Sequence, residues 1–192
     1  MTTDPDRIAA GLGELGALAD RTAAAAQALG PIVAAMRGCL AGGGTLFFAG
    51  NGGSAADAQH LATAYVVRYH SAQRRALRAV ALTTDSSTLT AAGNDFGFEQ
   101  VFARQLEGLG RPGDVLVVHS TSGNSRNLVA AVEAARELEM TTVALLGGDG
   151  GALLGLVDHA LVVAEDSVNP GKGLHPAIQH QIAAILTAEF GR

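Results

Sequence analysis

Cysteine, aromatic residues and long apolar runs are scarce in this sequence. Cys39 is the single cysteine, tryptophan is absent, and aromatic residues make up 4% of the chain. One cysteine forms neither an internal disulfide nor a cysteine-based zinc site, which favours a reducing, cytoplasmic setting. No uncharged apolar run approaches the ~20 residues of a membrane span, and the first residues lack the basic-then-apolar order of a secretory signal. We therefore expect a cytoplasmic protein with no membrane partner.

Charge is also sparse, and its balance is acidic. Charged residues account for 16% of the chain, and 13 Lys and Arg face 18 Asp and Glu, for a net charge of −5. Nucleic-acid binders depend on clustered cations, so direct nucleic-acid binding is not expected. The 192 residues, 48% of them apolar, suit one domain with a single core. We expect that domain to comprise N-terminal helices over residues 1–41 and an α/β core over residues 45–192.

The pattern of apolar residues predicts an α/β fold. Short apolar runs without alternation, typical of strands buried on both faces of a parallel sheet, alternate with helical stretches. The sequence thus predicts a doubly wound, five-stranded parallel sheet flanked by helices, with an N-terminal helical hairpin. The expected strands are Thr45–Ala49, Ala79–Leu82, Asp114–His119, Thr141–Leu146 and Ala160–Ala164. The expected helices run from Asp4 to about Leu29 and over Pro31–Leu40, Ser54–Tyr69, Ser86–Ala92, Phe96–Leu109, Ser125–Leu138 and Leu174–Phe190.

The N-terminal helices are rich in alanine on several faces. Such helices need to be buried, either against the sheet of their own chain or against another subunit, and both alternatives stay open. Gly11, Gly13 and Gly16 match the G-x-G-x-x-G spacing of dinucleotide-binding turns. That motif functions between a strand and a helix, whereas these glycines fall inside a helix, so we expect no nucleotide site there.

Two loops have the composition of a phosphate site. Gly50-Asn51-Gly52-Gly53-Ser54 follows the first expected strand and opens a helix, and Ser120-Thr121-Ser122-Gly123-Asn124-Ser125 does the same after the third. Glycines let the backbone approach a ligand, and hydroxyls and free N–H groups at helix N-termini hold a phosphate without a cation. No G-K-[ST] follows, which disfavours a nucleotide P-loop. The pattern indicates a small phosphorylated metabolite.

These loops, together with Asp57-Ala-Gln-His60 and Gly93-Asn-Asp-Phe-Gly97, resemble the sugar isomerase (SIS) family, and specifically its phosphoheptose isomerase branch. The resemblance runs from about Thr45 to Gly151. It implies the SIS fold and an aldose–ketose isomerase of sedoheptulose 7-phosphate that forms a homotetramer. It also implies that the sugar phosphate is bound by Asn51, Gly52, Gly53, Ser54, Arg68, Asp95, Ser120, Thr121, Ser122 and Ser125.

The expected catalytic residues depart from the pattern of that branch. Its isomerases place His and Glu at i and i+4 to bind zinc, with the Glu also acting as the base; here His60 is present but Ala64 takes the Glu position. On the C-terminal helix, Gln179 aligns loosely with a metal-binding Gln, and another register brings in His175 or His180. The resemblance therefore implies His60, Gln179 and His180 as catalytic candidates, and His60 and Gln179 as ligands of a possible zinc ion. Asp57 shares the helix face of His60 and either orients it or pairs with a cation.

Two further functions remain open. A SIS branch that associates with the replication initiator DnaA binds without catalysis, and it too lacks the base. Its helix reads Ala-Gln-His, as at Ala58-Gln59-His60 here, and its second loop carries Asn-Ser-Arg, as at Asn124-Ser125-Arg126. The other alternative is a regulatory sensor of phosphosugars. Sequence alone leaves open whether Ala64 reflects natural divergence or engineering.

Overall fold

The fold was analysed in a computed structural model, which describes residues 3–24, 26–69, 75–163 and 168–190. Within these residues, five parallel strands form one sheet in the order β2-β1-β3-β4-β5. The strands are β1 (Leu46–Gly50), β2 (Ala79–Ala81), β3 (Val115–Ser120), β4 (Thr141–Gly147) and β5 (His159–Val163). The predicted doubly wound parallel sheet is confirmed, and the predicted strand bounds agree with the observed ones within one residue. The predicted end of the last strand, Ala164, lies outside the described residues.

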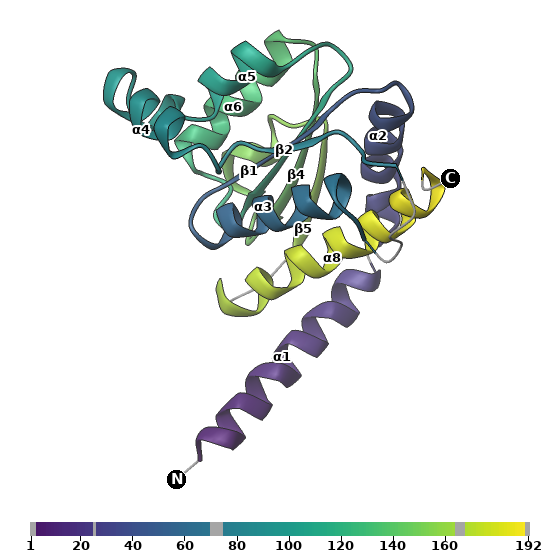
Figure 1. The fold of residues 1–192 in the computed structure, drawn as a ribbon. Coiled ribbons are helices and arrows are strands. Elements are labelled where there is room, and N and C mark those ends of the chain that lie inside the picture. The colour runs from purple at the N-terminus through teal and green to yellow at the C-terminus, as the bar shows by residue number, and fades with distance from the viewer. Residues whose placement is uncertain (1–2, 25, 70–74, 164–167, 191–192) are drawn as a thin grey trace.

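Helices cover both faces of this sheet (Figure 1). The first face carries α2 (Leu29–Ala41), α3 (Gly53–Val66) and α8 (Val168–Glu189). The second carries α4 (Ser86–Asp95), α5 (Ala103–Leu109), α6 (Arg126–Glu137) and α7 (Gly151–Leu154), with a 3₁₀ turn over Phe98–Gln100. The predicted helix over Phe96–Leu109 is therefore divided, and α7 has no counterpart among the predicted elements.

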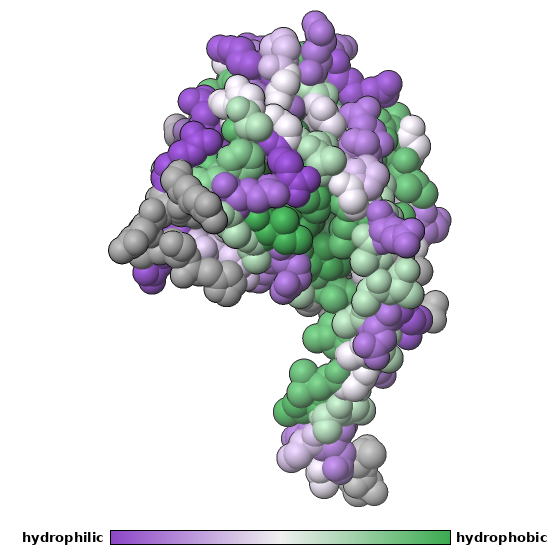
Figure 2. All heavy atoms as spheres, turned by 90° about the vertical axis from the view of Figure 1, so that its right-hand side faces the viewer, coloured by the Kyte–Doolittle hydropathy of each residue, from purple (hydrophilic) through white to green (hydrophobic). Residues whose placement is uncertain are grey.

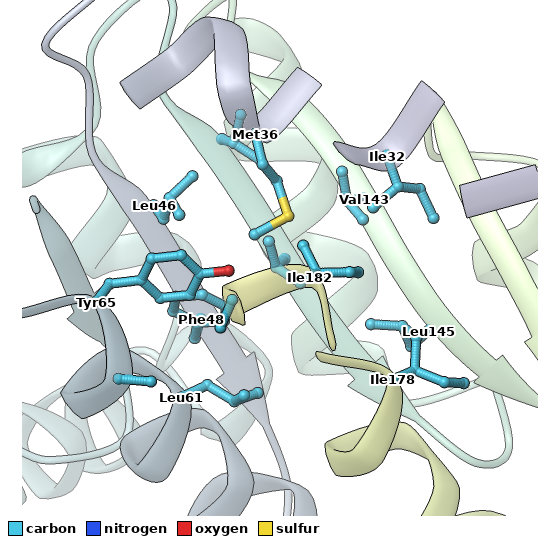
Figure 3. Packing of buried hydrophobic residues seen from close by; sticks show 14 of the residues in the cluster. Ile32, Met36, Leu46, Phe48, Leu61, Tyr65, Val143, Leu145, Ile178 and Ile182 are labelled. Atoms are coloured by element: carbon cyan, nitrogen blue, oxygen red, sulfur yellow. The ribbon is translucent and has the colours of Figure 1, made fainter. Parts of the chain in front are cut away.

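Strand residues alternate between two cores because successive side chains point to opposite faces of a sheet. Phe48 packs under the first layer of helices, and Phe47 packs under the second. Figure 3 shows the first core, where Ile178 and Ile182 of α8 lie against strand residues such as Val143 and Leu145. This alternation decides which layer of helices each residue at the end of a strand faces.

The N-terminal helix α1 (Asp4–Ala24) projects from the body of the protein (Figure 1). It packs on α8, with Leu18 buried, and meets α2 at a bend of 62°. Helices α1 and α2 therefore meet at an angle. Helix α1 gains its contacts from α8 and does not fold back along α2, as the two helices of a hairpin would. Gly11, Gly13 and Gly16 lie inside α1, as predicted.

The length and apolar character of the helices among the described residues bear on whether one of them could span a membrane. No single helix there has both the length and the apolar character needed to cross a bilayer. The bent pair of α1 with the following 26–41 segment meets the criteria of length and composition when the two are taken together.

The strand order places the two glycine- and serine-rich loops side by side. The chain leaves β1 toward α3 on the first face, and it leaves the adjacent strand β3 toward α6 on the second. Such a reversal between neighbouring parallel strands opens a crevice at their carboxyl ends, where α/β proteins bind ligands. The fold therefore directs attention to the β1–α3 and β3–α6 loops.

Candidate functional site

The β1–α3 loop is a tight glycine turn. A side chain at Gly50 would place its Cβ 2.6 Å from the backbone oxygen of Ser54, so only glycine fits. Gly52 has a φ of 57°, a left-handed conformation that glycine adopts without strain. Helix α3 begins at Gly53, so the positive end of its dipole lies at the crevice, while the backbone N–H groups of Ser54 and Ala55 donate to the carbonyl oxygens of Asn51 and Gly52.

The β3–α6 loop is held by its own hydroxyls and by a second glycine loop. The backbone N–H of Gly123 donates to Ser120 Oγ at 3.0 Å. Gly123 has a φ of 63°, and a Cβ there would lie 2.0 Å from the carbonyl oxygen of Gly150. Ser125 is the N-cap residue of α6. The loop is thereby fixed against the β4–α7 turn, and its N–H groups and hydroxyls gather at the crevice.

An amide pair ties the two loops together. Asn51 Nδ2 donates to Asn127 Oδ1 at 2.9 Å, and Asn127 Nδ2 donates to Asn51 Oδ1 at 2.8 Å. Asn127 is buried in the first turn of α6. This reciprocal pair sets the spacing between the N-termini of α3 and α6.

A small polar cavity of about 70 Å³ lies between the loops. Five hydroxyl side chains line it, and two helices of more than ten residues begin beside it. Hydroxyl donors and helix N-termini suit an anion, so the predicted meeting of the two loops is confirmed. The lining residues are Asn51, Ser54, His119, Ser120, Thr121, Ser122 and Ser125.

A second hollow of about 180 Å³ adjoins the polar cavity on the side of α4. The two share Asn51, and the hollow also includes Gly52 from the predicted site. Its other lining residues are Gly50, Ala55, Thr83, Leu89, Phe98, Val101 and Phe102. An anion in the polar cavity would therefore leave apolar space beside it.

Farther along α3, His60 meets His180 of α8. Their Nε2 atoms are 2.7 Å apart, and the rings form a T-shaped pair with centroids 4.9 Å apart. Tyr69 stacks on His180 at 5.4 Å. His60 lies six residues beyond Ser54, or about 9 Å along the helix axis, a span comparable with an extended seven-carbon sugar phosphate. The structure thus unites two of the predicted catalytic residues.

Burial and charge tune the groups around this pair. Burial, reinforced by the charge of His60, lowers the pKa of His180, while the nearby Asp57 opposes that shift. Burial raises the pKa of the Asp57 carboxyl, although both histidines counteract it. A lowered histidine pKa favours the neutral imidazole at pH 7, which is the form that accepts a proton.

Ala64 and Gln179 are both buried. Ala64 has 4% of its surface exposed, in the core beneath α3, and Gln179 is fully buried. The side-chain oxygen and nitrogen of Gln179 have no hydrogen-bond partner among the described residues. The predicted importance of these positions for catalysis stays a prediction.

The described side chains do not fit a zinc ion as they stand. Across the residues described, no three His, Cys, Asp or Glu side chains gather into a possible metal site. Two zinc-bound nitrogens at Zn–N distances of ~2.0–2.1 Å in a tetrahedron would be about 3.3 Å apart, whereas His60 and His180 contact each other directly at 2.7 Å. No residue is therefore assigned a metal-dependent role in the reaction.

Three predicted binding residues lie outside both hollows. Helix α3 ends at Val66, about one turn before its predicted end. Arg68 therefore lies beyond the helix, and it is exposed. Asp95 is exposed at the end of α4, where it accepts a hydrogen bond from Asn94 at 2.7 Å. Gly53 opens α3 without lining either hollow. These contacts with a sugar phosphate stay predictions.

His119 and Asn127 belong to the site but were not among its predicted residues. The sequence places His119 at the end of a strand. It is a polar residue that follows four apolar residues and directly precedes Ser-Thr-Ser, and this pattern is a signal for a site residue. Asn127 carries no comparable signal, because its partner Asn51 is 76 positions away in the sequence.

Comparison with known proteins agrees with this geometry. The SIS domain family matches residues 13–147. The chain is 47% identical to a phosphoheptose isomerase of Akkermansia muciniphila over 176 residues, covering 90% of this chain and 93% of that protein. It is 51% identical to a phosphoheptose isomerase of Chlorobium phaeobacteroides over 166 residues, covering 83% and 74%. The structure of a phosphoheptose isomerase from Neisseria gonorrhoeae superposes with a TM-score of 0.91 at 38% identity, covering 97% of this chain and all of that one. The chain belongs to the SIS domain family, and within it to the phosphoheptose isomerases.

Proposed function

We propose that this protein is a phosphoheptose isomerase that interconverts sedoheptulose 7-phosphate and the corresponding aldose phosphate. The observation that carries the proposal is the polar cavity between the β1–α3 and β3–α6 loops, which is lined by five hydroxyl side chains. Membership of the phosphoheptose isomerase branch identifies the phosphorylated seven-carbon sugar as the expected substrate. The phosphate would bind in the cavity, and the sugar would extend along α3.

The His60–His180 pair is the proposed proton-transfer group. In the ketose-to-aldose direction a base removes a proton from C1, the C2 oxygen gains a proton, and an enediol forms. The O1 proton is then lost as the C1 carbonyl forms, and a proton is returned to C2. Whichever ring donates its Nε2–H to the other, the Nδ1 of the donating ring carries a lone pair that can accept the C1 proton. This pair would thereby perform the role that Ala64 cannot.

A homotetramer is proposed as the functional assembly. An apolar hollow of about 440 Å³ lies between α2 and α8, lined mostly by apolar residues including Leu29, Val33, Ile182 and Ile185. Figure 2 shows apolar residues extending from this region along the projecting helix α1. Ile8 and Leu12 on α1 are each 65% exposed, which favours burial against another subunit.

Deuterium exchange tests the proposed reaction. The full-length protein is incubated with sedoheptulose 7-phosphate in D₂O, and NMR follows deuterium entering C1 of the ketose and C2 of the aldose. We expect exchange by the wild type, a loss of at least about tenfold in His180→Phe, and no change in His159→Phe, a control on the edge strand β5. Exchange that continues in EDTA would support a reaction without zinc.

The outcome also separates the alternative functions. If the wild type catalyses no exchange while the sugar phosphate raises its melting temperature, the cavity binds without turnover, and the proposed isomerase activity is wrong. If neither exchange nor a thermal shift occurs, the phosphate site itself is wrong.

A further inference from the structure

His119 occupies a special position at the end of β3. Val115 and Val117 of this strand face the first layer of helices, and alternation places His119 on the same face. Its ring lies between Phe48 of β1 and His175 of α8, with both ring centroids 6.5 Å away. The residue is 1% exposed, and it is nevertheless one of the residues that line the polar cavity.

The imidazole of His119 makes no hydrogen bond within the part of the chain that the structure describes. Neither Nδ1 nor Nε2 has a partner among the described residues. A buried polar group without a partner destabilises a fold by about 1–3 kcal/mol, so such groups are rare. The neighbouring His175 differs in this respect, because its Nε2 lies 3.1 Å from the carbonyl oxygen of Leu146. His119 alone of this stacked pair therefore keeps its full hydrogen-bonding capacity for a ligand.

The protonation state of His119 decides what it can bind. Burial, with a smaller contribution from His175, lowers the pKa of His119 to about 3. The ring is therefore neutral at pH 7, with one N–H donor and one lone pair. A phosphate dianion offers several acceptor oxygens and no donors, so the N–H is the group that matches it.

We propose that His119 is a further ligand-binding residue of this protein, one that donates its ring N–H to an oxygen of the bound phosphate. This inference rests on the proposed function, since it concerns the same cavity. The hydroxyls of Ser54, Ser120, Thr121, Ser122 and Ser125 would contact the phosphate from the loops. His119 would contact it from the end of the sheet, where a hydrogen bond satisfies the ring only when ligand is bound.

Calorimetric titration of His119→Phe tests this proposal. Phenylalanine keeps a buried aromatic ring but has no donor. We expect about tenfold weaker binding of both inorganic phosphate and sedoheptulose 7-phosphate, the loss typical of one hydrogen bond to a charged group. The melting temperature without ligand should be unchanged or higher, because an unpartnered polar group is removed. A merely structural histidine would instead give a lower melting temperature and unchanged affinity.

Two more variants sharpen the interpretation. His119→Gln supplies an amide N–H and should recover part of the affinity, while His159→Phe on β5 should bind like the wild type. If His119→Phe weakens the sugar phosphate but not inorganic phosphate, the contact is to the sugar and the proposal is overturned. Wild-type affinity of His119→Phe for both ligands would also overturn it, but would leave the proposed function intact.

Nitrogen NMR of the histidine side chains gives an independent result. With ¹⁵N-labelled histidine, titration with inorganic phosphate should shift the protonated ring nitrogen of His119, assigned by its absence in His119→Phe. A shift confined to other histidines would contradict the proposal. A wild-type protein that binds neither phosphate nor the sugar phosphate would refute the proposed function and this inference together.

Discussion

Asn51 and Asn127 exchange two side-chain hydrogen bonds, of 2.9 and 2.8 Å, across the crevice between β1 and β3. Asn51 belongs to the loop before α3, and Asn127 lies in the first turn of α6. Because the two helices cover opposite faces of the sheet, this pair fixes the relative position of the two helix N-termini that enclose the polar cavity.

Breaking the amide pair should weaken ligand binding. Asn127→Ala leaves the half-buried Asn51 amide without its partner, and we expect a loss of about 1–3 kcal/mol in the free energy of unfolding. We also expect about tenfold weaker binding of sedoheptulose 7-phosphate in calorimetric titrations. In the double variant with Asn51→Ala, the losses should be smaller than the sum of the single effects, since both remove one interaction. Strictly additive losses would show that the pair does not act as a unit.

Adding one methyl group at Gly123 should disrupt the second loop. The Cβ of Gly123→Ala would lie 2.0 Å from the carbonyl oxygen of Gly150, and the residue has a φ of 63°. We expect at least about tenfold weaker sugar-phosphate binding and a destabilisation of about 1–3 kcal/mol. Gly108→Ala, in α5 with open space around its Cβ, is the matched control and should retain wild-type binding. Unimpaired binding by Gly123→Ala would show that this loop geometry is not required.

The stability of the ligand-free protein should depend on pH through His119. Its pKa is lowered from 6.5 to about 3 by burial, so the unfolded state binds more protons between these values, and the free energy of unfolding falls as the pH decreases below about 6.5. At pH 5 the loss from this residue is about 2 kcal/mol relative to pH 7.5. Chemical denaturation of His119→Phe in phosphate-free buffer should show a pH dependence smaller by that amount. An identical pH dependence in both proteins would contradict the buried, neutral assignment.

Ala64→Glu tests the position where the base of related isomerases would stand. The side chain at this position is almost fully buried, so Ala64→Glu and Ala64→Gln should both lower the melting temperature, the charged variant more. We expect faster deuterium exchange in Ala64→Glu only, because its carboxylate would stand one turn beyond His60. Equal exchange rates in the two variants would show that a carboxylate here does not reach the substrate.

The sheet and its loops followed from local signals in the sequence. Buried parallel strands are short apolar runs, and the Gly and Ser clusters after Ala49 and His119 mark the turns that follow them. The four-residue α7 was missed because so short a helix lacks a periodic pattern. Helix α3 was predicted to extend to Tyr69 but ends at Val66. The apolar pattern at the end of this helix fits an end at Tyr69 as well as an end at Val66.

Contacts between elements far apart in the sequence were beyond local reasoning. The pairing of His60 with His180 joins residues 120 positions apart and depends on how α8 packs on α3. The register of α8 was left open by the sequence, and packing decides that His175 enters the core while His180 remains half-buried. His119 gained significance only when its buried ring proved to lack a partner.

A crystal structure of the protein with sedoheptulose 7-phosphate would test the central claim most directly. We predict phosphate density between Ser54, His119 and the 120–125 loop, with C1 and C2 directed along α3 toward His60 and His180. Phosphate density at any other place on the protein, with this cavity filled by water alone, would contradict the account.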